Sequence, residues 1–223
     1  PSLFGGGAPW RAVLPGRCKR SPPLLLALAF AAAWLARRGD RTGLFATATL
    51  AVAFVSPLCA ASSALFSARA IHHLLLVAVA APLIAATLRP ARRGTRLAVM
   101  PALALATACF WVWHLPGAYA AALSSTGVYW LMQATLLASA VAFWQAVRER
   151  QGEVVLPVLG LVLAAAQMGM LGAILTFAPQ PLYAPHAVAP LLWGLEPLAD
   201  QQLAGLIMWV PGMVPYAAAI AWF

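Results

Sequence analysis

Six long runs of apolar residues, separated by short polar stretches, set the pattern along this chain. A transmembrane helix needs about 20 mostly apolar residues, because the hydrocarbon core is about 30 Å thick and each helical residue rises about 1.5 Å. The runs that approach or meet this length are residues 44–61, 70–88, 97–115, 128–147, 154–178 and 202–223. A seventh run, residues 22–36, is shorter and is flanked by basic residues that can snorkel to the interface. The pattern predicts an all-α membrane protein with a bundle of seven transmembrane helices, or six if the first run does not span.

The basic residues between the runs predict how the bundle is oriented. Three connections on one side, residues 37–41, 89–96 and 148–150, contain three, four and two arginines. The connections on the opposite side, residues 62–69, 115–127 and 179–200, contain one basic residue, Arg69. By the positive-inside rule, the C-terminus is then cytoplasmic and the N-terminus is outside. The basic N-terminal segment, residues 1–21, disagrees with this orientation, because its basic residues would then face outside. We expect residues 22–223 to form a single transmembrane domain.

Composition agrees with a membrane protein and excludes several functions. The chain is 63% hydrophobic and only 9% charged, whereas soluble domains contain about 25% charged residues. Its formal net charge of +9 comes from basic residues that cluster between apolar runs. This distribution is typical of membrane-protein loops, so we expect the protein to contact the lipid bilayer and to bind no nucleic acid. Neither a zinc-site cysteine spacing nor a serine nucleophile motif occurs, and an enzyme is therefore not expected.

Ionisable and sulfur-containing side chains gather in the half of the predicted bundle that faces outside. His72 and His73 lie in the first turn of the third predicted helix, and His114 ends the fourth. Asp200 opens the seventh helix, and Met170 lies nearer mid-depth in the sixth. Ionisable groups inside a membrane are costly and mark functional sites, and imidazole with thioether suits copper. These five residues are the candidate metal ligands.

Simpler roles remain open for several of these side chains. Adjacent residues on a helix point about 100° apart, so His72 and His73 are not expected to face the same point. His114 lies in FWVWHLPGAY, whose tryptophans resemble an interfacial aromatic belt. Asp200 lies where a carboxylate caps a helix N-terminus.

Four segments, in order, resemble the CtaG family of bacterial polytopic membrane proteins that assemble cytochrome c oxidase. The most specific is PLADQQLAGLIMWVPGMVPY in the last helix. The supporting segments are FSARAIHHLLLVAVAAPLI, WVWHLPGAYAAAL and LGAILTFAPQPLY. Together they span residues 66–216, most of the chain.

The resemblance implies a role for particular residues. His73, His114 and Asp200 match family positions in the third, fourth and seventh helices. The residues that belong to the same signatures are Gln201, Gln202, Met208, Trp209 and Tyr119. Two positions depart from the family, which usually has histidines where this chain has Arg69 and Gln133. Arginine removes a ligand and adds a fixed positive charge, so either His72 replaces the missing ligand or the chain has kept only a scaffolding role.

We therefore expect an assembly factor for a haem-copper oxidase in the bacterial inner membrane. It would bind or insert a copper ion, or scaffold the catalytic subunit, at the outer face, and its partners would be that subunit or other oxidase subunits. The alternatives are a stable non-catalytic subunit of a respiratory oxidase complex, a copper permease and a membrane haem protein. Few polar residues lie in the inner half, which disfavours the permease, and the family resemblance gives no support to haem binding.

Overall fold

The computed structural model describes residues 22–89, 98–150 and 153–223, and this part of the chain is all-helical. The predicted basic segment 1–21 lies outside the described residues, as does most of the predicted connection 89–96. The prediction of an all-α fold is therefore confirmed for the described residues.

Four helices are long and apolar enough to cross a membrane. They are the continuous helix Phe66–Thr87, α9 (Thr126–Arg148), α10 (Val155–Phe177) and α11 (Pro197–Ala221). The first of these consists of α5 (Phe66–Leu74), a π-helical turn η1 (Leu75–Ala80) and α6 (Ala81–Thr87). In η1 the N–H of Ala81 donates to the carbonyl of Leu76, which is the i to i+5 spacing of a π-helix.

Two further apolar helices are bent where a proline begins a new helix. They are α3 (Arg41–Val55) followed by α4 (Pro57–Ala64), bent by 49°, and α7 (Val99–His114) followed by α8 (Pro116–Ser124), bent by 74°. Proline disfavours helical geometry at the residue before it, and Ser56 and Leu115 are accordingly extended. The predicted run 44–61 is thus interrupted at Ser56. A shorter apolar helix, α2 (Pro22–Arg37), precedes them.

By length and composition the described part contains four spanning helices, or six if each bent pair spans. The predicted number of seven and the predicted orientation are not confirmed by this count.

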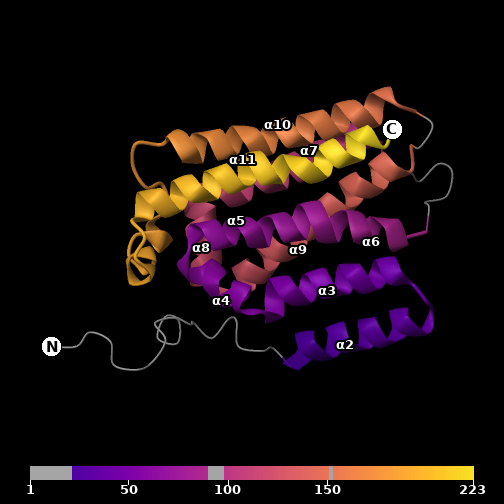
Figure 1. Cartoon of the computed structure of the whole chain (residues 1–223), viewed down its shortest axis with the longest axis horizontal. Helices are drawn as coiled ribbons and strands as arrows, with labels where there is room; N and C mark the ends of the chain where they lie inside the picture. The colour runs from indigo at the N-terminus through magenta and orange to yellow at the C-terminus, as the bar shows by residue number, and fades with distance from the viewer. Residues whose placement is uncertain (1–21, 90–97, 151–152) are drawn as a thin grey trace.

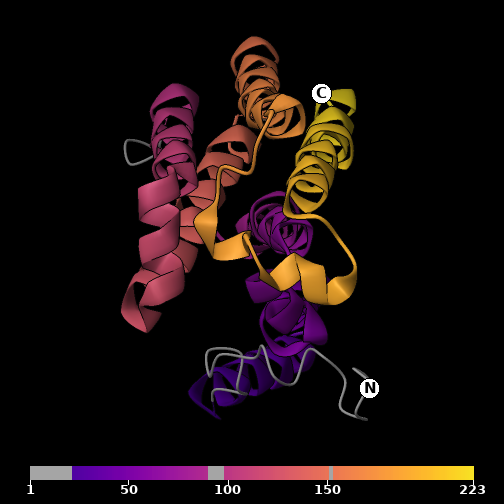
Figure 2. The same cartoon turned by 90° about the vertical axis from the view of Figure 1, so that its left-hand side faces the viewer.

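The helix Phe66–Thr87 is the centre of the bundle. Its two halves pack against α11, α9 and α3, while α10 packs along α11 and α7 packs along α9. Figures 1 and 2 show α2 at one edge, where it contacts α3. None of its residues is buried.

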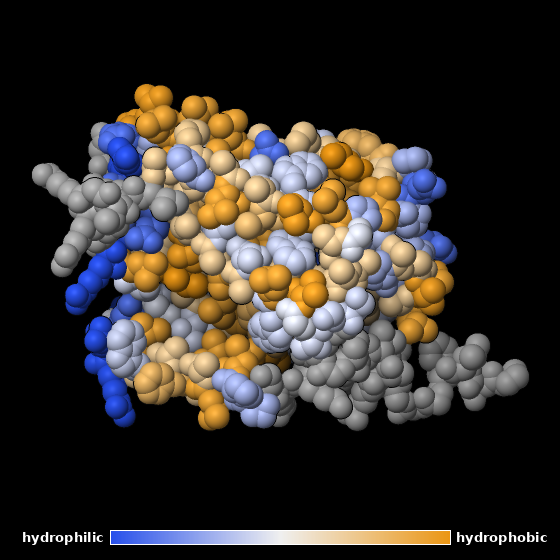
Figure 3. Space-filling model, turned by 180° about the vertical axis from the view of Figure 1, so that it is seen from behind, coloured by the Kyte–Doolittle hydropathy of each residue, from blue (hydrophilic) through white to orange (hydrophobic). Residues whose placement is uncertain are grey.

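The two ends of the bundle differ in charge. One end, which we call the loop end, contains α4, α8 and the connection 178–196 between α10 and α11 (Figure 1). That connection includes the short 3-10 helices η2 (Ala184–His186) and η3 (Ala189–Trp193). The other end, which we call the basic end, contains Arg37, Arg41, Arg89 and Arg148. In Figure 3 strongly hydrophilic side chains mark the basic end, at the left, and apolar side chains cover much of the surface between the two ends.

Close packing of α10 on α11 depends on two facing glycines. A Cβ added at Gly205 would lie 2.6 Å from the carbonyl oxygen of Gly172, and one added at Gly172 would lie 2.8 Å from that of Gly205. Neither backbone atom can move aside as a flexible side chain would. Small residues at such a contact are the usual means by which membrane helices approach closely.

We therefore expect Gly205→Ala to destabilise the protein by up to about 3 kcal/mol, the range found for overpacked cores. The control is Gly117→Ala, because no atom lies within 4 Å of the Cβ added there. Thermal unfolding in detergent would measure both. Equal melting temperatures would show that the two helices do not need this contact.

Candidate functional site

A small buried chamber, which we call the histidine chamber, lies between the central helix, α7, α9 and α11 near the loop end. Its polar lining consists of Arg69, His72, His73, His114, Tyr119 and Gln133. Two methionines, Met132 and Met208, line the same space. The free volume is about 20 Å³, which is room for about one water molecule.

His73 and His114 are in ring contact inside this chamber. Their ring centroids lie 5.1 Å apart with the planes at 89°, and Phe110 contacts both rings. His114 Nδ1 lies 2.7 Å from the carbonyl oxygen of Phe110. Because a carbonyl only accepts, Nδ1 carries the hydrogen and Nε2 keeps a free lone pair. His73 Nε2 is buried and has no hydrogen-bond partner among the described residues.

His72 has different neighbours from His73, as helix geometry predicts. Its ring packs against Phe54 with centroids 5.1 Å apart at 83°. The side chain nevertheless lines the chamber, and its Nε2 is also buried without a partner in the described structure. The two histidines therefore share one cavity although their rings pack on different helices.

Arg69 lies one helical turn before His73 and is only 7% exposed. Its guanidinium carbon lies 5.2 Å from the ring centroid of Tyr129 and 5.9 Å from that of Tyr119. Its Nη2 donates to the sulfur of Met132 at 3.7 Å. The ion pair found among the described residues is elsewhere, at the basic end of α9. Within the described part of the chain, no carboxylate forms an ion pair with this buried cation.

Asp200 is fully buried and caps α5 from another helix. Its carboxylate accepts hydrogen bonds from Phe66 N at 2.6 Å, Ser67 N at 3.1 Å and Ser67 Oγ at 2.5 Å. The residue at the start of α5, Leu65, offers no side-chain cap of its own. A carboxylate at a helix N-terminus accepts hydrogen bonds from the free N–H groups and interacts favourably with the positive end of the helix dipole. Capping is therefore what the structure assigns to Asp200, although the capped helix is α5 and not α11.

Hydrogen bonds hold the connection 178–196 against three helices at the loop end. Tyr183 Oη donates to the carbonyl of His114 at 2.7 Å. His186 Nδ1 lies 3.0 Å from the carbonyl oxygen of Ala64, and its Nε2 lies 2.7 Å from Tyr119 Oη. Burial lowers the pKa of His186, which favours the neutral ring that donates to Ala64 and accepts from Tyr119.

Gln201 ties the same connection to α11. Its Oε1 accepts from the N–H of Leu182 at 2.6 Å, and its Nε2 donates to the carbonyl oxygens of Leu175 and Gln180. The DQQ element thus organises the loop end: the aspartate caps α5, and the first glutamine holds the connection.

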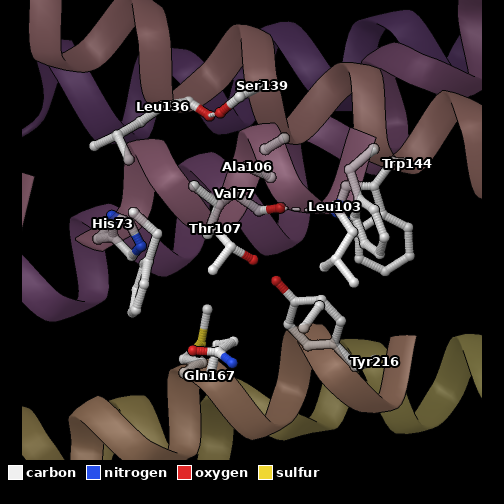
Figure 4. A pocket seen from close by; sticks show the side chains of 15 residues that line it. His73, Val77, Leu103, Ala106, Thr107, Leu136, Ser139, Trp144, Gln167 and Tyr216 are labelled. Carbon is white, nitrogen blue, oxygen red and sulfur yellow. Dashed lines mark hydrogen bonds between the residues drawn. The ribbon is translucent and has the colours of Figure 1, made fainter. Parts of the chain in front are cut away.

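A second cavity, of about 50 Å³, continues from His73 into the middle of the bundle (Figure 4). His73 and Leu136 line both cavities. The hydroxyl groups of Thr107 and Tyr216 point into this space in Figure 4. On its wall, Trp144 Nε1 donates to the carbonyl oxygen of Val77 in the π-helical turn at 2.9 Å.

The structure does not bring all the predicted ligands together. Met170 is 48% exposed on α10, and Asp200 is occupied at α5. Within residues 22–89, 98–150 and 153–223, no three His, Cys, Asp or Glu side chains gather as a metal site would require. His73 and His114 remain as the pair in contact.

The other signature residues in the last helix mostly make packing contacts. Met208 is buried at the chamber, Trp209 contacts Phe177 and the Gly172 region, and Gln202 is half-buried. Sequence reasoning missed Met132, whose sulfur lines the chamber and accepts from Arg69. One methionine in an apolar run gives no signal that would have identified it.

Comparison with known families gives one match. Residues 27–223 match the family model described as cytochrome c oxidase caa3 assembly factor (Caa3_CtaG). No curated protein and no solved structure matches the chain.

Proposed function

Because the chain belongs to the Caa3_CtaG family of cytochrome c oxidase assembly factors, we propose that it binds cuprous copper on His73 and His114 and delivers it to the oxidase catalytic subunit. The observation that carries this proposal is the buried contact of the two rings, with a lone pair free on His114 and an unpartnered nitrogen on His73. Copper is the cargo in this proposal.

The donor set of the chamber suits that ion. Imidazole nitrogen and thioether sulfur both bind cuprous copper, and Met132 and Met208 line the same space as the two histidines. A metal-binding histidine commonly donates its second ring N–H to a carbonyl, as His114 does to Phe110. Few ligands and the nearby charge of Arg69 weaken retention, which favours transfer over storage.

The same proposal places the loop end outside and the basic end in the cytoplasm of a bacterial cell. It rests on the arginines of the basic end and on the positive-inside rule. With seven crossings, the N-terminus is outside and the C-terminus is cytoplasmic. The chamber then lies near the outer surface, and Tyr183 of the connection 178–196 is hydrogen-bonded to the carbonyl of His114 at that end.

A scaffolding role without copper is the second candidate. Two observations favour it: the described residues contain no cluster of three His, Cys, Asp or Glu ligands, and a guanidinium stands beside the histidine pair. In this form the loop end would hold the catalytic subunit while another protein supplies the metal.

Purification of the tagged protein from cells limited for copper, and from copper-replete cells, tests both forms. We expect the protein to co-purify with catalytic subunit that is not yet mature, and to contain copper close to one ion per chain in the replete cells. If the factor co-purified with immature catalytic subunit but contained no copper, the copper proposal would be contradicted and the scaffolding role supported. A fixed ratio to mature oxidase would contradict both and indicate a permanent subunit.

A further inference from the structure

Unpartnered polar atoms concentrate around Arg69. Five buried side-chain nitrogen or oxygen atoms in the described structure have no hydrogen-bond partner. Four of them belong to His72, His73, Tyr129 and Gln133. Three of those four side chains line the histidine chamber with Arg69, and the fourth, Tyr129, has its ring against the guanidinium. Buried polar atoms are nearly always paired with protein, water or an ion, so this cluster indicates an occupant.

Two members of the cluster can only donate hydrogen bonds. A guanidinium has five N–H donors and no acceptor, and the nitrogen of a glutamine amide likewise only donates. Arg69 donates to a methionine sulfur, a weak acceptor, and Gln133 Nε2 has no partner. The carboxylate of Asp200 is already bonded to the first turn of α5. Among the described residues, Gln133 Nε2 therefore has no acceptor, and the guanidinium of Arg69 donates to a weak one.

We propose that the histidine chamber binds a small monovalent anion of chloride size, held by the guanidinium of Arg69 and the amide N–H of Gln133. A buried charge is costly unless it is compensated, and an anion supplies both the charge and the acceptor. His72 adds a third donor in the tautomer that carries hydrogen on Nε2. The free volume of about 20 Å³ excludes phosphate, sulfate and any larger carboxylate.

Other occupants satisfy fewer of the groups. A water molecule would accept the hydrogen bonds but would place no negative charge directly against Arg69. A cation on the Arg69 side would meet a fixed positive charge at hydrogen-bond distance. The anion would be held by donors other than His73 and His114. Because the free volume of about 20 Å³ has room for one small occupant, the anion would fill the chamber of the metal-free protein, and a copper ion would displace it.

The test is an anion titration of the purified, metal-free full chain in detergent. Thermal unfolding is followed in sodium gluconate while chloride or bromide replaces gluconate at constant ionic strength. We expect a saturable rise in melting temperature with chloride and with bromide, because a ligand that binds only the folded state stabilises it. Broadening of the chloride-35 resonance by the protein gives a second readout. No saturable response by either readout would overturn the proposal.

Variants locate the site. Arg69→Met should weaken chloride binding at least about tenfold, the scale of one hydrogen bond to a charged group. Arg38→Met is the matched control, since Arg38 is exposed and packs on Trp34, and it should bind chloride as the unaltered protein does. Chloride binding that is unchanged in Arg69→Met would contradict the assignment.

A second variant keeps the test decisive if Arg69→Met does not fold. Gln133→Glu places a carboxylate beside Arg69 and supplies the anion from the protein itself. We expect this variant to be stable without chloride and to show no chloride-dependent rise in melting temperature. A chloride response equal to that of the unaltered protein would overturn the proposal. Because these experiments use metal-free protein, their outcome is separable from that of the copper measurements.

Discussion

The double variant His73→Ala, His114→Ala is expected to lose copper binding by at least about 100-fold. Removing a group that only orients a metal ligand already costs 10- to 100-fold in affinity, and this variant removes both imidazoles of the contacting pair. Copper in the purified protein and cuprous affinity by competition with a chromogenic chelator measure the loss. In cells that lack the native gene, the variant should leave oxidase activity at the level of the empty vector.

His72→Ala is the matched control for this experiment. It removes an imidazole of the same chamber, one residue away, whose ring packs on Phe54 and not on His114. We expect it to retain copper, with a melting temperature that reports any cavity effect common to all three substitutions. If His72→Ala lost copper and the double variant did not, His72 would be the ligand that replaces the histidine missing at position 69. Copper retained in the double variant would contradict the pair.

Asp200→Ala is expected to give the largest loss of stability, about 3 to 5 kcal/mol. The substitution leaves three buried donors at the start of α5 without an acceptor, and each buried unsatisfied donor costs about 1–3 kcal/mol. It also removes the negative charge at a helix N-terminus. Thermal and denaturant unfolding in detergent, and the amount of protein in the membrane, are the measurements.

Two further substitutions separate capping from charge. Asp200→Asn keeps one acceptor oxygen and should lose about half as much stability, whereas Glu196→Gln, at an exposed carboxylate just before α11, should lose almost none. If Asp200→Ala unfolded like Glu196→Gln, the hydrogen bonds to Phe66 and Ser67 would not be holding α5. Loss of copper binding with unchanged stability would instead indicate a ligand role.

Local rules recovered those parts of the molecule that depend on neighbouring residues. The apolar runs predicted the helical fold. Helix geometry predicted that His72 and His73 do not face the same point; their rings do pack on different neighbours, but both side chains line the histidine chamber. The resemblance carried by PLADQQLAGLIMWVPGMVPY is confirmed by the family match over residues 27–223. Helix periodicity and composition suffice to predict the helices and the directions of neighbouring side chains, because both depend on residues within a few turns.

Contacts between distant segments could not be predicted in the same way. Asp200 bonds to residues 133 and 134 positions earlier, and nothing in its own helix indicates this. The break at Ser56 is different: Pro57 is a local signal for it, but the prediction of a single span used only the length of the apolar run. Met132 was missed because its role depends on Arg69, which reaches it from another helix.

The π-helical turn gives the central helix a change of phase. A turn with i to i+5 bonding holds about one residue more than an α-helical turn, so the segment before Leu75 is rotated by about 100° relative to an uninterrupted helix. In evolutionary terms, η1 has the form of a one-residue insertion retained within a membrane helix. The wider turn leaves the Val77 carbonyl to Trp144 and sets the angular position of His73. A sequence one residue shorter here would keep its hydropathy and its motif, yet direct that imidazole away from His114.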